Sequence, residues 1–300
     1  MAGAGRTLNR IRRRRRRLGA LDLAILAASA LLAGWLAWRV QAVFVYRWDW
    51  SAIPSFILRY DEAAGRWLPS LLGQGLLLTL RLAVWGGLLA GIVGVLAGTS
   101  AALGGPSLRL LARAFVAAVR NTPPLVLVFV LYFFVSSQLL PAMGAAAWAQ
   151  GLDGPARSVA AFLFGEPSRL DAFVAGAVCL GLFEAAYVAE IVRAGIASVP
   201  KGQGEASASL GLSRLDGLRF VVMPQALRST LPPLASQFVS LVKDSSIVSL
   251  ISIPELTFMA SQTVNTTQRT FEVWITVGAI YFVLCFALTR LFARFERGRI

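Results

Sequence analysis

Five charged side chains interrupt two long apolar stretches of the sequence, and they are the first candidates for chemistry. They are Glu184, Glu190, Arg193, Lys243 and Asp244. A charge near the centre of a membrane costs roughly 2.5–3.5 kcal/mol on insertion scales, so such residues usually pair with one another or face a polar path. Glu190 and Arg193 are three residues apart and can pair on one helix. Glu184 has no partner at that spacing, and the adjacent Lys243 and Asp244 point in different directions.

Two polar residues precede a pair of prolines in another uncharged stretch. Asn121 and Thr122 stand directly before Pro123 and Pro124. Proline lacks an N–H donor, and the residue before a proline disfavours helix. The carbonyl groups freed in this way could face a zwitterionic solute, as in the broken helices of transporters. Equally, the two prolines could begin a helix at the cytoplasmic face.

Residues needed for several common chemistries are missing. The chain of 300 residues has no histidine, two cysteines and two lysines. Both cysteines, Cys179 and Cys285, lie in apolar runs, which is typical of buried packing. Neither Lys201 nor Lys243 follows a glycine in the phosphate-binding spacing GxxxxGK[ST]. The sequence therefore predicts no catalytic residue, no metal site and no ATP-hydrolysing site in this chain.

The composition places most of the chain in a membrane. Apolar residues make up 57% and charged residues 15%, whereas soluble domains average about 45–50% and about 25%. A spanning helix needs about 20 mainly apolar residues, which predicts spans at 23–46, 82–102, 121–152, 172–197, 229–253 and 273–289. The stretch 67–80 either begins the second span or lies along the interface, and the third span is expected to end near Pro141. The predicted fold class is an all-α membrane protein with about six transmembrane helices.

The distribution of positive charge orients these helices. With the N-terminus in the cytoplasm, 19 of the 29 basic residues fall in inner segments and 6 in outer loops, as the positive-inside rule requires. Both termini are then cytoplasmic. The run Arg12–Arg17 is interpreted as a topology anchor that contacts anionic lipid, at about 1 kcal/mol per basic residue, and not as a nucleic-acid site. The predicted domains are an arginine-rich arm (1–19), an additional transmembrane helix with its outer loop (20–66) and a membrane core that holds the remaining spans (67–298).

One cytoplasmic loop, residues 200–225, has a helical pattern. Residues 205–210 predict a short helix that ends at Gly211, because glycine adopts the left-handed cap most easily. Ser213 followed by Asp216 is the start signal of a second helix, expected to run until Pro224. Such a protrusion suits docking in a groove of another protein. Taken alone, the pattern also fits an amphipathic loop that lies on the membrane surface.

The 200–225 loop resembles the EAA loop of ABC-importer permeases. That pattern is E-A-A, three residues, G, nine residues and then I-x-L-P, and it matches here at Glu205, Ala206, Ser207, Gly211, Val221, Met223 and Pro224. Ser207, Val221 and Met223 replace alanine, isoleucine and leucine, and none of these changes alters the spacing. The earlier Glu184-Ala185-Ala186 does not fit, because Glu190 stands where the glycine should be.

Further segments are similar to the polar amino-acid branch of these permeases. They are Asn121-Thr122-Pro123-Pro124-Leu125-Val126, Glu184-Ala-Ala-Tyr187-Val-Ala-Glu190-Ile-Val-Arg193-Ala-Gly195-Ile196, Pro200-Lys-Gly202-Gln203, Pro224-Gln225-Ala226 and Leu241-Val-Lys243-Asp244-Ser245-Ser246. The resemblance covers about Leu71 to Arg294. It leaves the first span and the arginine-rich arm outside.

The resemblance implies a type I ABC-importer transmembrane domain with a cytoplasmic EAA coupling loop. Such a chain is the permease subunit of an ATP-driven amino-acid importer in a bacterial inner membrane. The implied partners are a dimer of cytoplasmic ATPases, a second permease subunit (the same or a related chain) and an extracytoplasmic amino-acid-binding protein. ATP and Mg would be bound by the ATPases, and this chain would bind no cofactor. The alternative is an ion- or proton-coupled secondary amino-acid transporter, which would have no reason to carry an EAA-spaced loop.

The resemblance assigns coupling to the ATPase to Glu205, Ala206, Ser207, Gly211 and Pro224. Candidates for the substrate path are Asn121, Thr122, Glu184, Tyr187, Glu190, Arg193, Lys243, Asp244 and Ser245. A zwitterionic amino acid needs a counter-charge at each end, and Glu184 is the leading candidate for the ammonium end. Two structural interpretations compete with these roles: an ion pair between Glu190 and Arg193, and one between Glu184 and Lys243.

Overall fold

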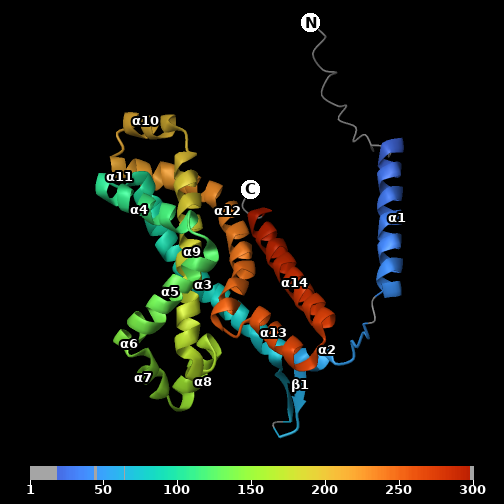
Figure 1. Cartoon of the computed structure of the whole chain (residues 1–300). Helices are drawn as coiled ribbons and strands as arrows, with labels where there is room; N and C mark the ends of the chain where they lie inside the picture. The colour runs from blue at the N-terminus through green and yellow to red at the C-terminus, as the bar shows by residue number, and fades with distance from the viewer. Residues whose placement is uncertain (1–18, 44–45, 64, 298–300) are drawn as a thin grey trace. The chain divides into compact units, whose positions relative to one another are not determined.

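The computed structural model describes residues 19–43, 46–63 and 65–297, which form two units that divide after Trp48 (Figure 1). The first unit contains α1 (Ala20–Val43), an apolar helix with Asp22 in its first turn. The Asp22 carboxylate accepts a hydrogen bond from the backbone N–H of Gly19 at 2.9 Å, which satisfies one of the donors at the start of the helix. The predicted arginine-rich arm lies outside the described residues, except for Gly19.

The second unit begins with the short helix α2 (Ile53–Ile57) and a hairpin of two antiparallel strands, β1 (Leu58–Asp61) and β2 (Arg66–Pro69), with Leu58 opposite Pro69. The helical elements that follow are α3 (Leu71–Leu103), α4 (Pro106–Arg120), α5 (Pro124–Phe134), η1 (Val135–Leu139), α6 (Leu140–Met143), α7 (Ala145–Gln150), α8 (Gly154–Phe164), η2 (Pro167–Arg169) and α9 (Leu170–Ala197). The last group is α10 (Lys201–Ser209), α11 (Arg214–Asp216), η3 (Gly217–Val222), α12 (Met223–Asp244), η4 (Ser245–Ile251), α13 (Leu256–Thr267) and α14 (Thr270–Arg297).

Five stretches of the described chain are long and apolar enough to cross a membrane. They are Leu71–Leu103, Pro124–Met143, Pro167–Ala197, Arg214–Ile251 and Thr270–Phe295. They correspond to the second to sixth predicted spans. The first predicted span corresponds to α1, whose apolar part Ala20–Leu36 is shorter than the other five. The predicted fold class, an all-α membrane protein, is confirmed.

Three boundaries can be compared with the expectations. The stretch 67–80 is divided, since Trp67 belongs to strand β2 and α3 begins at Leu71. The third span ends at Met143, near Pro141 as expected. Pro141 itself lies in the first turn of α6, where no helical N–H is needed, and the helix stops at Gly144 with φ +65°. Pro123 is the N-cap of α5, so the proline pair begins a helix.

Helices α3 and α9 pack closely because small residues line their contact. A Cβ atom at Gly98 would lie 2.5 Å from the carbonyl oxygen of Ala189, and one at Gly94 would lie 2.6 Å from Cβ of Val188. Glycine at such positions lets two helix backbones approach closely. Close packing of this kind favours helix association in lipid. Leu82 and Leu180 are fully or almost fully buried in the same core.

We expect Gly98→Ala to destabilise the chain by about 1–3 kcal/mol, because the added methyl group overpacks the contact between α3 and α9. Gly91 lies on the same helix, and a Cβ there would meet nothing within 4 Å. Gly91→Ala is therefore the matched control and should be neutral or slightly stabilising through helix propensity. Thermal unfolding of both variants in detergent measures the difference. Equal melting temperatures would contradict this account of the packing.

Polar side chains fix α13 and the segment before α2 to the rest of the second unit. The fully buried Glu255 carboxylate accepts hydrogen bonds from the backbone N–H of Phe258 at 2.8 Å and from the Tyr281 hydroxyl at 2.9 Å. The backbone N–H of Asp49 donates to Glu272 at 2.7 Å, and the Asp49 carboxylate pairs with Arg269. A hydrogen bond from Ser51 to the Asp49 carboxylate is the main reason why the pKa of Asp49 is lowered. The Asp49 contacts join segments more than two hundred residues apart.

Candidate functional site

The 200–225 loop folds into a compact protrusion between α9 and α12. Helix α10 ends next to Gly211, which has φ +79°, as the sequence predicted. Ser213 caps α11, since its hydroxyl accepts from the backbone N–H of Asp216 at 3.2 Å and donates to the Asp216 carboxylate at 2.6 Å. The start signal at Ser213 is confirmed.

The two arms of the loop are held together by small polar contacts. Ser207 is buried, and its hydroxyl donates to the carbonyl oxygen of Gly204 at 2.7 Å. A Cβ at Gly217 would lie 2.5 Å from that same hydroxyl oxygen, so η3 can approach α10 only because residue 217 is glycine. The side-chain amides of Gln203 and Gln225 close the base of the loop at 3.4 Å. The loop therefore has one defined shape.

The second helix of the loop does not end at Pro224, contrary to the prediction. Pro224 lies in the first turn of α12, which begins at Met223 directly after the π-helical turn η3. A proline in the first turn removes an N–H that has no helical acceptor, so the helix can continue. As a result the loop passes without a break into a membrane-spanning helix.

The outer surface of the loop carries large apolar side chains. Leu210, Leu215 and Phe220 are 82%, 77% and 63% exposed. Glu205 and Ala206 are also exposed, whereas Ser207 faces inward. Exposed apolar groups on a structured protrusion are typical of a surface that another protein covers. The five predicted coupling residues thus lie in one protrusion, with Pro224 at its junction with α12.

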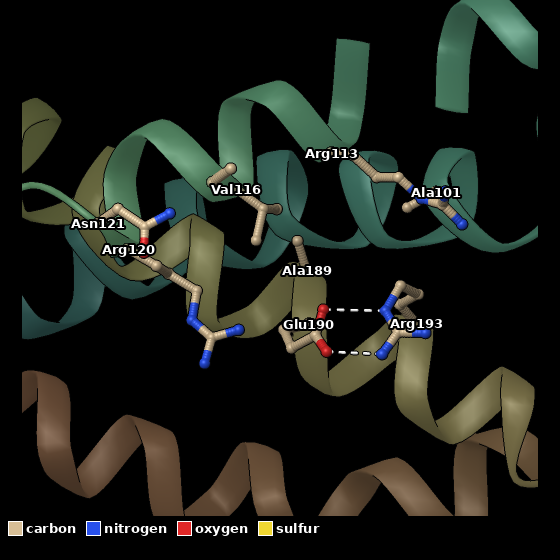
Figure 2. A pocket seen from close by; sticks show the side chains of 9 residues that line it. Ala101, Arg113, Val116, Arg120, Asn121, Ala189, Glu190 and Arg193 are labelled. Carbon is tan, nitrogen blue, oxygen red and sulfur yellow. Dashed lines mark hydrogen bonds and ion pairs between the residues drawn. The ribbon is translucent and has the colours of Figure 1, made fainter. Parts of the chain in front are cut away.

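A charged cavity of about 520 Å³ lies between the C-terminal end of α3, helix α4 and helix α9. Figure 2 shows Asn121 and Arg120 from the α4 end extending toward this space, with Glu190 and Arg193 on α9. The Arg193 guanidinium donates to both carboxylate oxygens of Glu190, at 2.9 and 2.6 Å. The predicted Glu190–Arg193 pair is confirmed.

Two further arginines make the cavity strongly positive. Arg113 and Arg120 line it together with Arg193, against the single carboxylate of Glu190. The Arg120 guanidinium also lies over the ring of Tyr187, 5.8 Å from its centroid. The cavity can therefore hold an anionic group beside the arginines and a cationic group beside Glu190.

The other predicted path residues lie elsewhere. Glu184 is fully buried and contacts Gln237 of α12 at 2.7 Å. Lys243 lines a separate groove between α12 and α14, and the described residues contain no ion pair between Glu184 and Lys243. The Thr122 hydroxyl donates to the carbonyl oxygen of Ala118, and that of Ser245 to Val242, within their own helical segments.

Three residues of these sites were not singled out from the sequence. Arg113 and Arg120 counted there only as inner basic residues, although their seven-residue spacing places them on one face of a helix. That spacing was an available signal. Gln237, the partner of Glu184, gave no such signal, because nothing in the sequence shows that α12 faces α9 at that position.

Known proteins match most of this chain. The family model described as "Binding-protein-dependent transport system inner membrane component" matches residues 90–300. The glutamine transport system permease protein GlnP of Escherichia coli (strain K12) is 33% identical over 253 residues, which cover 84% of this chain and 97% of GlnP. The octopine transport system permease protein OccM of Rhizobium radiobacter is 35% identical over 189 residues, or 63% of this chain and 69% of OccM.

Solved structures agree with the sequence matches. The crystal structure of an amino acid ABC transporter with histidines has a TM-score of 0.63 and 29% identity, and the match covers 85% of this chain and 100% of that one. The MetNI methionine ABC transporter shares the fold, with a TM-score of 0.57, 19% identity and coverage of 76% and 95%. The chain therefore belongs to the family of inner-membrane components of binding-protein-dependent transport systems.

Proposed function

We propose that this chain is the permease subunit of an ATP-driven amino-acid importer and that the 200–225 loop couples it to a separate ATPase. The observation that carries the proposal is the loop itself: a helical protrusion with exposed apolar side chains that continues directly into the membrane helix α12. A force on the loop would act on α12. The sequence contains no Walker A lysine, so ATP and Mg would be bound by the partner ATPase, and this chain would hold no cofactor.

The charged cavity supplies the chemistry for an amino-acid substrate. The matched relatives GlnP and OccM are named as permease proteins of glutamine and octopine transport systems. One solved structure with a similar fold is an amino acid ABC transporter. Arg120 and Arg113 can bind an α-carboxylate, and the Glu190 carboxylate can bind an α-ammonium group. A volume of about 520 Å³ lies in the range of small-molecule sites. We assign Asn121, Glu190 and Arg193 to the substrate path, with Tyr187 next to it through Arg120.

The orientation follows from the positive charge. We propose that the loop and both termini face the cytoplasm of a bacterial cell and that the β1–β2 hairpin faces the opposite side, as their positions at opposite ends of the α3–α9 pair suggest (Figure 1). The partners are then two cytoplasmic ATPases, a second permease subunit and an extracytoplasmic amino-acid-binding protein. The arginine-rich arm would contact anionic lipid.

A secondary transporter is the competing function. It would use an ion gradient and would need no ATPase. The matched relatives are subunits of binding-protein-dependent and ABC systems, so this alternative is not favoured.

Purification from native membranes tests the docking role of the loop. We expect the tagged chain to retain an ABC ATPase, and Leu215→Asp with Phe220→Asp to lose most of it. Each buried Leu or Phe side chain stabilises a contact by about 1.5–3 kcal/mol, so the double variant should weaken binding far more than tenfold. The matched control is Trp67→Asp, which alters an exposed apolar side chain on the β1–β2 hairpin. Equal ATPase recovery with both variants would contradict the proposal.

A further inference from the structure

Helix α3 carries an arginine inside a membrane-spanning stretch. Arg81 is the tenth residue after Leu71, so it lies about 15 Å along the helix from its start. The ion pairs of the described chain do not include it. An ionisable side chain within a span is unfavourable and usually has a functional partner. Neither the 200–225 loop nor the charged cavity uses Arg81, so its position requires another explanation.

The end of helix α8 holds one edge of the Arg81 guanidinium. Its Nε–H donates to the carbonyl oxygen of Phe162 at 2.9 Å. Gly165 follows α8 with φ +93°, and a Cβ atom there would lie 3.4 Å from Nη1 of Arg81. The N–H groups of Nη1 and Nη2 donate no hydrogen bond within the described chain. A structural role at the end of α8 therefore accounts for Nε alone.

Arg81 borders a cavity of about 300 Å³ between α3, α9 and the turn after α8, here called the Arg81 cavity. Its apolar wall consists of Leu77, Leu78, Phe164, Phe173, Pro254 and Met259. Gln74 supplies a neutral polar group, since its Nε2 donates to the carbonyl oxygen of Pro69 at 3.1 Å and Oε1 is left to accept. At the rim, Arg169 and Glu166 pair with each other, and both are more than half exposed. Arg81 is therefore the lining charge that has no ion pair within the described chain.

The chemistry of the Arg81 cavity fits a small organic carboxylate. Two terminal N–H groups of a guanidinium match the two oxygens of a carboxylate. Because the Nε contact already orders the Arg81 side chain, binding costs little further entropy. Gln74 and Arg81 lie seven residues apart on one face of α3, about 10 Å along its axis, so Gln74 can accept from an N–H group at the other end of the solute. We propose that the Arg81 cavity binds an amino acid, whose carboxylate pairs with Arg81.

The Arg81 cavity and the charged cavity lie toward opposite ends of α3. Arg81 borders the first and Ala101 the second, and these two residues are about 30 Å apart along the helix. The hydrocarbon core of a membrane is also about 30 Å thick. The Arg81 cavity lies in the half of α3 that follows the β1–β2 hairpin. An imported amino acid would reach it before the charged cavity, an order that rests on the proposed function.

Fluorine NMR of the isolated chain tests the site locally. The full-length chain, labelled with fluorotryptophan, is placed in phosphatidylcholine nanodiscs without ATP, ATPase or binding protein. Trp85 is the reporter, because its ring centroid lies 5.0 Å from that of Phe164 in the cavity wall, and Trp85→Phe assigns its resonance. The probes are L-glutamine, L-glutamate, L-arginine and L-leucine. We expect at least one of them to shift the Trp85 resonance saturably, and a resonance that responds to none would overturn the proposal.

A carboxamide analogue identifies the contact with Arg81. Replacing the α-carboxylate of the active probe by a carboxamide should weaken binding to the wild-type chain at least tenfold. Arg81→Gln should weaken binding of the probe by a similar factor and remove the difference between the two ligands. Arg59→Gln is the matched control, since Arg59 is an exposed arginine on β1, and it should bind the probe as the wild type does.

Two further results would contradict the proposal. A carboxamide that binds the wild-type chain as tightly as the carboxylate would exclude the contact with Arg81, and this comparison needs no variant that could disturb α8. Displacement of the probe by phosphatidylglycerol in the nanodisc would show that the guanidinium binds a lipid phosphate instead. Since neither ATP nor transport is involved, a failure here is distinct from a failure of the proposed function.

Discussion

Replacing Gly211 with valine should reduce transport-stimulated ATP hydrolysis about tenfold or more while leaving the membrane helices folded. Gly211 has φ +79°, and a residue with a Cβ atom costs about 1–2 kcal/mol in the left-handed region. Valine is branched at that carbon, so the turn between α10 and α11 would rearrange. Glu205 and Leu215, on the two sides of the turn, would then no longer present one surface to the ATPase.

Two variants control this experiment. Gly202 lies in α10, and a Cβ there would meet nothing within 4 Å, so Gly202→Val tests whether any valine in the loop is harmful. Gly211→Asn should recover much of the activity, since asparagine tolerates the left-handed conformation. The measurement is ATPase stimulation by the loaded binding protein in the assembled transporter. Full stimulation in Gly211→Val would remove the loop from its role as the coupling element.

The second large effect is expected in the charged cavity. Glu190→Gln should reduce uptake by about tenfold, because it removes the one carboxylate that lines the cavity. The amide oxygen of glutamine can still accept from Arg193, but the charge-assisted part of the contact, about 1.5–3 kcal/mol when buried, is lost. The loss is smaller here because both side chains are about a third exposed. The Glu166–Arg169 pair has the same spacing but is exposed, with an N–O distance of 3.7 Å. Glu166→Gln should therefore have little effect, as for most exposed ion pairs.

A charge swap separates recognition from structure. Glu190→Arg combined with Arg193→Glu restores an ion pair but exchanges the positions of the two charges. If Glu190 binds the substrate ammonium group, the swapped chain should regain stability and not uptake. If the pair is only structural, uptake should return together with the melting temperature. Measuring KM and maximal rate alongside thermal unfolding decides between these outcomes.

The sequence predicts the membrane spans and the local signals well, because both depend on neighbouring residues. Hydropathy indicates the helix from Leu170 to Ala197, the three-residue spacing indicates the Glu190–Arg193 pair, and glycine indicates the turn at position 211. Each of these features requires only one helix or one turn. The continuous helix through Pro224 was missed, because a π-helical turn before it changes which N–H groups need acceptors.

Contacts between different helices could not be predicted from the sequence. Glu184 had no partner on its own helix, and the suggested ion pair with Lys243 does not form. The rotation of α12 places Gln237 against Glu184, and it places Lys243 in the groove next to α14. Gly195 lets α12 approach α9 closely at Thr230, and a contact of this kind depends on the packing of two helices. The grouping of Arg113 and Arg120 with Glu190 also depends on helix packing, here between α4 and α9.

Uptake by reconstituted vesicles tests the central claim most directly. The chain is purified with its ATPase and placed in proteoliposomes with ATP on the inside, and the binding protein is added outside with each common amino acid in turn. The account predicts accumulation of a specific amino acid that requires both ATP and the binding protein and persists when proton and sodium gradients are dissipated. Accumulation driven by an ion gradient in the absence of ATP would contradict it and identify the chain as a secondary transporter.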